Sequence, residues 1–306
     1  MSLPAVPLGA YVCLAASMML VGSYVGLSRL LVAAIPVFLL AWMRFGIAAV
    51  AMATWLRRRP GELPLSARDR KLLFWESFLG NFGFSICMLF GVAATSAVAA
   101  GVVMAAIPAV VALLSRVFLG ERIAPRVQWA IVVAAAGIAT LALAREPQEP
   151  GAAPAPWWGY ALLLGAVVCE ASYVVIGKRL AATVSAQRIS ALINLWGLAL
   201  ITPLGLWQAL SFPFGGVSAS TWALLVFYAL AASVATVWLW MRGLRHVPAS
   251  RAGIFTVCLP VSAATVGVVW LGEPFGPAHG LAFAMALAGL VLATWPDQAA
   301  PQANRS

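Results

Sequence analysis

The residues of this chain best suited to chemistry are polar side chains placed inside long apolar segments. Glu170 lies in the string Cys169-Glu170-Ala171-Ser172-Tyr173, within an apolar segment that runs from residue 157 to residue 177. In hydrocarbon such residues are costly and usually face the interior of a helix bundle or an aqueous cavity. A carboxylate at this depth could bind an ammonium group, or it could take up and release a proton. The sequence also allows a structural ion pair with Arg44, the one cation away from the ends of a predicted span.

A stripe of hydrogen-bonding groups lies on another predicted helix. Ser77, Asn81 and Ser85 recur every four residues and therefore share one helix face. Such donors and acceptors suit the ammonium and carboxylate of an amino acid, while the alternative is hydrogen bonding to a neighbouring helix. Tyr24 could stack against a ring, and Trp238 is one of four Trp residues placed away from the predicted span ends. The candidate binding residues are Ser17, Tyr24, Ser77, Asn81, Ser85, Glu170, Tyr173 and Trp238.

Two prolines interrupt predicted helices at matching places. At Pro108 and Pro260 the ring removes one backbone hydrogen bond and frees a carbonyl oxygen. Paired interruptions of this kind point to a midplane site or a hinge in membrane proteins built from inverted repeats. We therefore expect helices to bend at these prolines, the alternative being a static kink that serves packing.

An internal duplication relates the elements that must position these residues. A block of about fifty residues recurs, without gaps, at one offset of 152, and weaker echoes at offsets of 150 and 151 reach the early helices. In each copy a Glu follows a Leu-Gly step, and we expect Glu121 and Glu273 to cap helices and anchor loops. The matching pairs are Gly91 and Gly243, Ala97 and Ala249, Ala100-Gly101 and Ala252-Gly253, Pro108 and Pro260, Leu119-Gly120-Glu121 and Leu271-Gly272-Glu273, Pro125 and Pro277, and Gly137 and Gly289.

The composition predicts that both copies lie in a membrane. Hydrophobic residues make up 63% of the 306 residues and charged residues only 9%, against roughly 25% charged in soluble domains. Ten apolar segments are close to the length of about 20 residues that spans a bilayer as a helix. They cover residues 8–28, 35–56, 72–92, 95–115, 127–144, 157–177, 189–210, 222–242, 250–270 and 278–295.

We therefore predict an all-α polytopic membrane protein with ten transmembrane helices in two inverted five-helix repeats. Because each repeat holds an odd number of helices, the two repeats cross the bilayer in opposite directions. The expected boundaries are residues 1–146 for the first repeat, 147–156 for a linker rich in Pro, Ala and acidic residues, and 157–306 for the second repeat.

The distribution of basic residues predicts the orientation. Sixteen of the 19 Lys and Arg residues follow spans two, four, six and eight or lie in the C-terminal tail, whereas the opposite side has only Arg29 and Arg145. The positive-inside rule then places both termini in the cytoplasm. The net charge of +10 is thus a topology signal, and no nucleic-acid partner is expected. Glu76, one turn inside its span, is expected to pair with the basic cluster at residues 68–71.

The two copies together resemble the EamA-type family of the drug/metabolite transporter superfamily. In each copy a Pro precedes a Leu-Gly-Glu turn, and a helix containing Gly137 or Gly289 follows. Pro36 followed by Trp42-Met43-Arg44-Phe45 is also similar to the family's second helix. Within the family the chain looks most like bacterial exporters of aromatic amino acids. The resemblance implies a cavity between the repeats, framed by helices one, three, four, six, eight and nine, that opens alternately to each side.

The expected function is therefore secondary-type export of small metabolites, aromatic amino acids first, across the bacterial cytoplasmic membrane. The alternatives are a broad-specificity drug/metabolite or other amino acid exporter, a passive pore and, more remotely, an intramembrane enzyme. An enzyme would need a catalytic cluster, yet the two His residues, His246 and His279, lie at span ends. The sequence contains no phosphate-binding loop with a GK[ST] ending, so we do not expect ATP-driven pumping. We expect a small-molecule substrate, no metal and no cofactor; a monomer is compatible with the sequence, which does not fix the oligomeric state.

Overall fold

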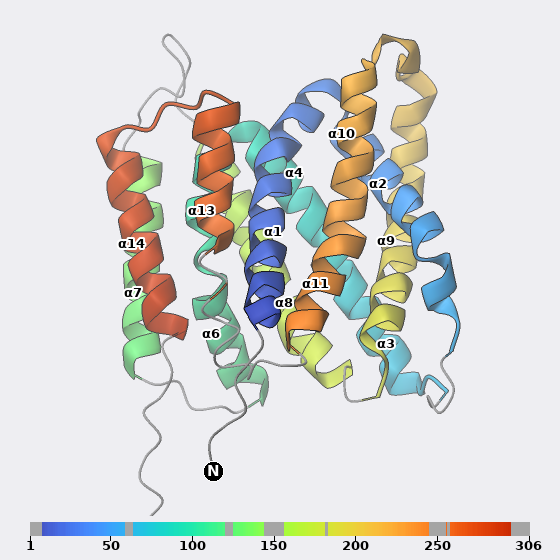
Figure 1. Cartoon of the computed structure of the whole chain (residues 1–306), viewed down its shortest axis with the longest axis horizontal. Helices are drawn as coiled ribbons and strands as arrows, with labels where there is room; N and C mark the ends of the chain where they lie inside the picture. The colour runs from blue at the N-terminus through green and yellow to red at the C-terminus, as the bar shows by residue number, and fades with distance from the viewer. Residues whose placement is uncertain are drawn as a thin grey trace, which may run out of the picture.

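The chain forms an all-helical bundle with two repeats, as predicted (Figure 1). The computed structural model describes residues 8–58, 64–119, 125–143, 156–180, 183–244, 255 and 258–294. The first half contains α1 (Leu8–Ala34), α2 (Val37–Ala51), η1 (Ala53–Leu56), α3 (Ala67–Ser77), η2 (Phe78–Gly83), α4 (Phe84–Ala94), α5 (Ala97–Met104), α6 (Ile107–Leu119) and α7 (Pro125–Leu143). The second contains α8 (Trp157–Leu180), α9 (Ala186–Ser211), η3 (Phe214–Gly216), α10 (Ala219–Leu230), η4 (Ala231–Ala235), α11 (Thr236–Leu244), α13 (Cys258–Thr265), η6 (Val266–Trp270) and α14 (Pro277–Thr294).

Within these described ranges the helices group into ten rods, because consecutive short helices continue one another. α3, η2 and α4 form one rod, and so do α5 with α6, α10 with η4 and α11, and α13 with η6. Six of the ten rods are long and apolar enough to cross a membrane, and four are shorter apolar helices, namely Val37–Ala51, Gln128–Gly137, Cys258–Trp270 and Pro277–Leu292. Part of the predicted span 250–270 lies outside the described residues.

Local capping explains where several rods begin. α3 starts at Ala67, five residues before the predicted span, because Ser66 and Asp69 form a reciprocal capping box. The Ser96 hydroxyl accepts the Ala99 N–H at the start of α5, and Ser218 caps α10 in the same way. Apolar pattern alone does not reveal these starts, since the first turn of α3 is polar.

The third rod of each half contains a π-helical turn at the equivalent place. η2 covers Phe78–Gly83 and η4 covers Ala231–Ala235, which correspond at the offset of 152. A π turn inserts one extra residue into an α-helix and is frequently found at functional sites. The two insertions therefore change the direction of the side chains that follow them, in both halves alike.

The two halves are related by a pseudo-twofold axis. α1 packs on α13 and α11, while its counterpart α8 packs on α6 and α4, the counterparts of those two helices. α2 packs on its own counterpart α9, and α7 packs on α14. α1 begins at the end marked N in Figure 1, and α8 begins at the opposite end. This arrangement confirms the predicted inverted repeats.

Small residues let helices of different halves approach closely. A Cβ at Gly22 of α1 would collide with the backbone of Leu259 in α13, and one at Gly26 would lie 2.8 Å from a methyl group of Val266. Two glycines four residues apart are a common feature of closely packed membrane helices, and here they face α13 and η6. α1 is thereby held against the second half along its middle turns.

Candidate functional site

A cavity of about 340 Å³ lies inside the bundle and is lined by both halves. Its lining is a mixture of aromatic rings, aliphatic groups and a few polar side chains, which is the usual character of a small-molecule site. The polar and aromatic lining residues are Ser17, Tyr24, Arg44, Asn81, Phe84, Glu170, Tyr173, Ser190, Asn194, Ser233, Thr236 and Trp240.

Five of the eight predicted binding residues line this cavity, namely Ser17, Tyr24, Asn81, Glu170 and Tyr173. They come from three rods, because Tyr24 lies on α1, Asn81 on the π turn η2, and Glu170 on α8. Tyr173 packs on Gly80, where an added Cβ would lie 2.6 Å from the tyrosine's own Cβ. The absence of a side chain at Gly80 thus lets α8 bring its acidic and aromatic residues to the cavity wall.

The other three predicted binding residues lie away from the cavity lining. Ser77 is fully buried and donates a hydrogen bond to the Ile193 carbonyl oxygen at 2.6 Å, which is the structural alternative for this stripe. The Ser85 hydroxyl accepts a hydrogen bond from Arg44 at 2.7 Å. The three stripe residues diverge because the π turn η2 lies between Ser77 and Ser85 and disturbs the four-residue repeat.

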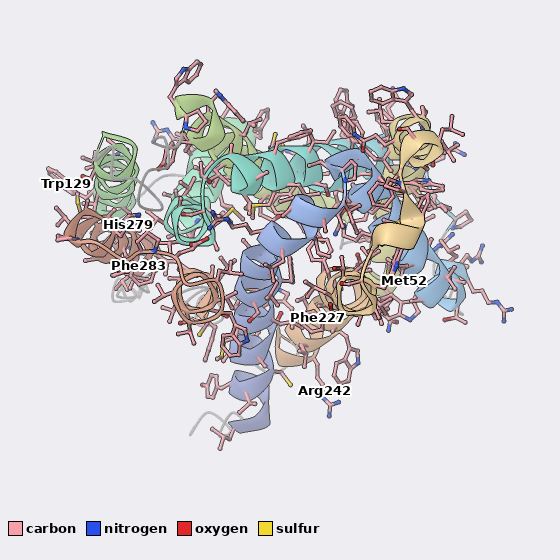
Figure 2. The ribbon with its side chains drawn as sticks, turned by 90° about the horizontal axis from the view of Figure 1, so that it is seen from above. Met52, Trp129, Phe227, Arg242, His279 and Phe283 are labelled. Carbon is pink, nitrogen blue, oxygen red and sulfur yellow. The ribbon has the colours of Figure 1, made fainter. Side chains whose placement is uncertain are left out.

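Trp238 points outward, whereas Trp240, two residues further along α11, lines the cavity. The Trp238 side chain is 47% exposed and its ring lies 5.2 Å from the guanidinium carbon of Arg242. Figure 2 shows Arg242 at the periphery of the bundle. The structure therefore places Trp240 on the cavity wall, and the predicted Trp238 lies outside it.

The predicted ion pair between Arg44 and Glu170 is not formed. Both side chains line the same cavity, but no nitrogen of Arg44 lies within 4.0 Å of a Glu170 oxygen. Arg44 is instead held by Ser85 and by the ring of Phe45, whose centroid lies 4.2 Å from the guanidinium carbon. Glu170 has no hydrogen-bond or ion-pair partner within the described residues. The cavity wall thus carries an acidic and a basic side chain that do not form an ion pair with each other.

The two predicted hinge prolines have different surroundings. Pro108 lines the cavity, and the helical rod is interrupted just before it, between Met104 and Ile107. Pro260 lies in α13 and is buried, with its carbonyl oxygen 3.2 Å from a Cβ built on Gly101. The break before Pro108 follows from the missing N–H of the ring.

Several polar lining residues have no place among the sequence candidates: Ser190, Asn194, Ser233 and Thr236. Asn194 donates from Nδ2 to the Phe45 carbonyl oxygen at 2.9 Å, and its Oδ1 is buried with no partner within the described residues. Ser233 could have been found from the duplication, because it stands 152 residues after Asn81. Repeat partners of a candidate residue are therefore a usable signal.

Glu76 also differs from its predicted role. Its side chain is 1% exposed, it packs against Gly177 of α8, and its Oε2 has no partner within the described residues. The predicted salt bridge to the cluster at residues 68–71 is therefore not formed. Because α3 already begins at Ala67, Glu76 lies more than two turns into the helix and is buried in the bundle.

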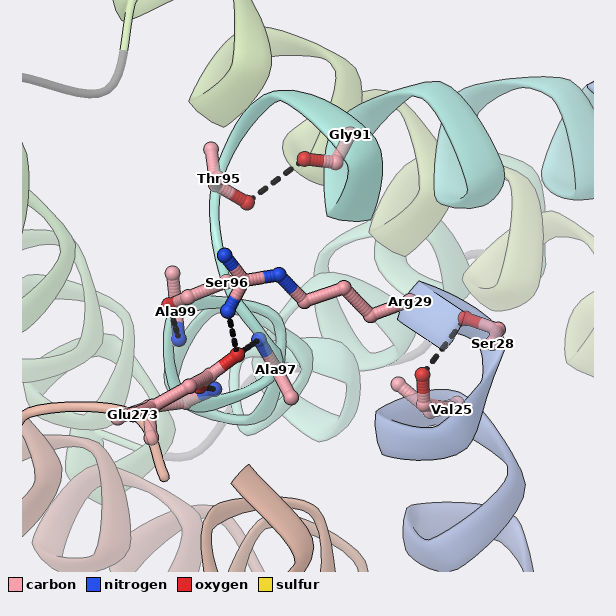
Figure 3. Close-up of polar contacts among 10 residues, drawn as sticks. Val25, Ser28, Arg29, Gly91, Thr95, Ser96, Ala97, Ala99 and Glu273 are labelled. Atoms are coloured by element: carbon pink, nitrogen blue, oxygen red, sulfur yellow. Dashed lines mark hydrogen bonds and ion pairs between the residues drawn. The ribbon is translucent and has the colours of Figure 1, made fainter. Parts of the chain in front are cut away.

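Glu273 bridges the two halves on the other side of the cavity (Figure 3). It follows Gly272, whose φ of 65° is readily adopted only by glycine. Its carboxylate accepts the N–H groups of Ala97 and Val98 at the start of α5, each at 2.9 Å, and pairs with Arg29 of α1. The predicted capping role is confirmed for Glu273, and a carboxylate there is favoured by the helix dipole. Its repeat partner Glu121 lies outside the described residues.

The cavity and this bridge occupy different depths of the bundle. α5 runs from the bridged residues Ala97 and Val98 towards Ile107 and Pro108 at the cavity. α9 lines the cavity with Ser190 to Asn194, close to its start, at the end of the bundle where α8 finishes. One end of the molecule is therefore bridged between halves, and the cavity lies towards the other end.

Comparison with known proteins identifies this architecture. The model of the EamA-like transporter family matches the chain twice, at residues 8–143 and 157–295. The chain belongs to the EamA-like transporter family. The two matches to the EamA-like model correspond to the two halves seen in the fold, and they leave the residues between 143 and 157 unmatched.

Two similar proteins come from a bacterium. The chain is 36% identical over 284 residues to the uncharacterized transporter YetK of Bacillus subtilis, covering 92% of this chain and 86% of YetK. It is also 32% identical over 139 residues to the uncharacterized transporter YwfM of the same organism, covering 44% of each. A crystal structure with 21% sequence identity superposes with a TM-score of 0.61 over 92% of this chain and 94% of that one, which supports the fold.

Membership of the EamA-like family decides the class of function. The chain is a multi-pass membrane transporter, and it is not an enzyme. A transporter of this family acts on a small molecule, and the cavity between the halves is the place where the described structure could hold one.

Proposed function

We propose that this protein is a secondary carrier that exports small metabolites, aromatic amino acids in the first place, by alternating access. The observation that carries this proposal is a cavity between two inverted halves, with Arg44 from one half and Glu170 from the other on its wall. Tyr24, Tyr173 and Trp240 supply rings for an aromatic side chain. Inverted repeats that rock around a central site are the common basis of alternating access.

The topology that we propose places the protein in the bacterial cytoplasmic membrane with both termini in the cytoplasm. The biased distribution of Lys and Arg supports this orientation. The cavity then lies towards the cytoplasm, and the bridge of Glu273 with Arg29 lies on the external side. We also propose repeat boundaries at residues 1–146 and 157–306, with 147–156 as the linker.

The experiment for this proposal is uptake of radiolabelled phenylalanine and tryptophan into proteoliposomes that hold the purified protein, with empty liposomes as the control. We expect saturable uptake that unlabelled aromatic amino acids block. Uptake that rises linearly with concentration would indicate a passive pore. Uptake blocked equally by unrelated drugs and metabolites would favour the broad-specificity exporter, and absence of uptake with folded protein would contradict aromatic amino acids as substrates.

The two neighbouring tryptophans of α11 offer a matched pair for this assay. Replacing the cavity residue, Trp240→Ala, removes a ring that can contact an aromatic substrate, and aromatic pairs contribute roughly 0.5–1.5 kcal/mol beyond buried area. We expect the KM for tryptophan to rise about two- to tenfold. Trp238→Ala removes a ring that lies outside the cavity, so its KM should stay within error of the unmodified protein. An equal effect of both variants would contradict this placement of the substrate.

A further inference from the structure

Arg44 is a buried cation whose hydrogen-bonding capacity is largely unused. Its side chain is 6% exposed and lines the cavity. One terminal nitrogen, Nη2, donates to the Ser85 hydroxyl at 2.7 Å, and Nε is buried with no partner within the described residues. A guanidinium has five N–H donors arranged to bind carboxylates in a bidentate manner. Ser85 and two aromatic rings are the contacts that the structure gives it.

No carboxylate of the described protein compensates this charge. The salt bridge of the described residues joins Arg29 to Glu273, and Glu170 on the same cavity is not within ion-pair distance of Arg44. A buried charge without an opposite charge is strongly unfavourable. Arg44 therefore occupies a position that favours an anionic group arriving from the cavity.

Two tyrosines, Tyr24 and Tyr173, line the same cavity as Arg44. Tyr24 lines the cavity and packs edge-to-face on Tyr228, and the Tyr228 centroid lies 5.7 Å from the Arg44 guanidinium carbon. Within the described residues neither Tyr24 nor Tyr173 has a hydrogen-bond partner for its hydroxyl. Both can thus donate to an oxygen of a bound molecule.

The carboxylate of Glu170, on the opposite wall of the cavity, limits which molecules can bind at Arg44. Glu170 faces the cavity from α8 with no cation beside it. A dianion such as phosphate would be opposed by this carboxylate, and a simple amine would leave Arg44 unpaired. A molecule with one carboxylate and one ammonium satisfies both walls.

We propose that Arg44 is the carboxylate-binding residue of the cavity and that the transported molecules are zwitterions, held with the carboxylate at Arg44 and the ammonium towards Glu170. This assignment rests on the proposed carrier function and adds to it the residue that binds the substrate's carboxylate. Because Arg44 belongs to the first repeat and Glu170 to the second, such a substrate connects the two repeats that must move against each other.

The test compares amino acids with the amines obtained by removing their carboxylate. The probes are phenylalanine with phenethylamine, tryptophan with tryptamine, and leucine with isoamylamine, each assayed for binding to the purified protein by ligand-induced thermal shift and for competition in proteoliposomes. We expect each amino acid to bind at least about tenfold more tightly than its amine, since a charged hydrogen-bonding partner is lost. If amines bind as tightly as amino acids in all three pairs, the assignment is wrong.

Variants locate the effect at Arg44. In Arg44→Gln the amino acids should lose at least about tenfold in affinity while the amines change little, so the preference within each pair disappears. Arg44→Lys, which keeps the charge and loses the bidentate geometry, should recover part of the preference. Arg242→Gln is the matched control, because Arg242 is a peripheral cation (Figure 2). An unchanged preference in folded Arg44→Gln protein overturns the proposal.

A second variant and the transport assay separate the role of Arg44 from protein folding and from the carrier function. If Arg44→Gln does not yield a monodisperse protein, Ser85→Ala removes the hydrogen bond that orients the guanidinium, and it should reduce the preference by a smaller factor. Saturable transport without any preference for zwitterions would leave the carrier function standing and refute the role of Arg44. Absence of transport with a clear binding preference would instead separate the binding site from the proposed export.

Discussion

Two acidic residues of the bundle, Glu170 and Glu273, differ in whether protein groups satisfy their carboxylates. Glu273 accepts two backbone N–H groups and pairs with Arg29. Glu170 is open to the cavity and has no partner within the described residues. A carboxylate left free on a cavity wall is available to a ligand, whereas one that already has three partners is structural. Residue type and depth alone do not separate these two roles.

Glu170→Gln distinguishes an ammonium anchor from a proton carrier. If the carboxylate holds the substrate's ammonium group, we expect exchange of labelled phenylalanine at equal pH to weaken, with the KM rising about tenfold or more, because a charge-assisted hydrogen bond is lost. If the carboxylate only carries a coupling proton, exchange at equal pH stays intact and uptake driven by a pH gradient disappears. Loss of neither activity would refute both roles for Glu170.

For single residues, the sequence predicts which polar side chains lie inside the bundle better than it predicts what those side chains contact. The cost of polar groups in hydrocarbon points correctly to Glu170, Tyr24 and Asn81 as residues of the bundle interior. It does not predict the partner of Arg44, because depth in the membrane says nothing about rotation around a helix axis. Ser85 and the Phe45 ring hold Arg44 away from Glu170.

Among the elements, the paired π turns are the feature that most directly shapes the cavity. η2 supplies Gly80 and Asn81 to the wall, and η4 supplies the equivalent residues Ala232 and Ser233. Apolar periodicity cannot reveal such turns, since a π insertion changes hydrogen bonding without changing composition. The ten rods could be predicted from hydropathy, but the register that selects cavity-facing residues could not.

The two prolines give a prediction at the same scale. We expect the double variant Pro108→Ala, Pro260→Ala to slow transport by about tenfold or more, which corresponds to about 1.4 kcal/mol on the barrier, because a continuous helix resists bending. The measurement is the initial rate of phenylalanine uptake at matched protein content in proteoliposomes. A rate close to that of the unmodified protein would show that the prolines serve packing alone.

The two single variants separate the positions. Pro108 lines the cavity next to an interrupted rod, whereas Pro260 is buried against Gly101 of α5. We therefore expect Pro108→Ala to account for most of the loss in rate. Pro260→Ala should act mainly through packing against Gly101.

For the molecule as a whole, the duplication predicts the neighbours of each helix. Once α1 is known to pack on α11 and α13, the exchange of halves predicts that α8 packs on α4 and α6, as it does. Both copies contain the same Leu-Gly-Glu turn, so the duplication also predicts a counterpart of the Glu273 bridge at Glu121, which lies outside the described residues.

The strength of that bridge can be measured by comparing two variants. Glu273→Gln removes the charge that caps α5 and the pairing with Arg29, while Arg29→Gln removes only the pairing. We expect Glu273→Gln to cost about 1–3 kcal/mol of stability and Arg29→Gln distinctly less, since Arg29 is 29% exposed. Thermal unfolding of the purified proteins provides the comparison, with the double variant reporting their coupling. A larger loss for Arg29→Gln would contradict the capping role.

The same capping contact sets an order of events during biogenesis. The first N–H groups of α5 are satisfied by a side chain 176 residues later in the chain. At a synthesis rate of about 5–20 residues per second, that partner emerges from the ribosome roughly 10–35 s after α5 does. During this interval α5 has entered the membrane region with an unfinished end, and Leu39 of α2 waits in the same way for the Gln208 side chain. The hydrogen bonding of the first half of the chain is therefore completed only after the second half has been synthesised.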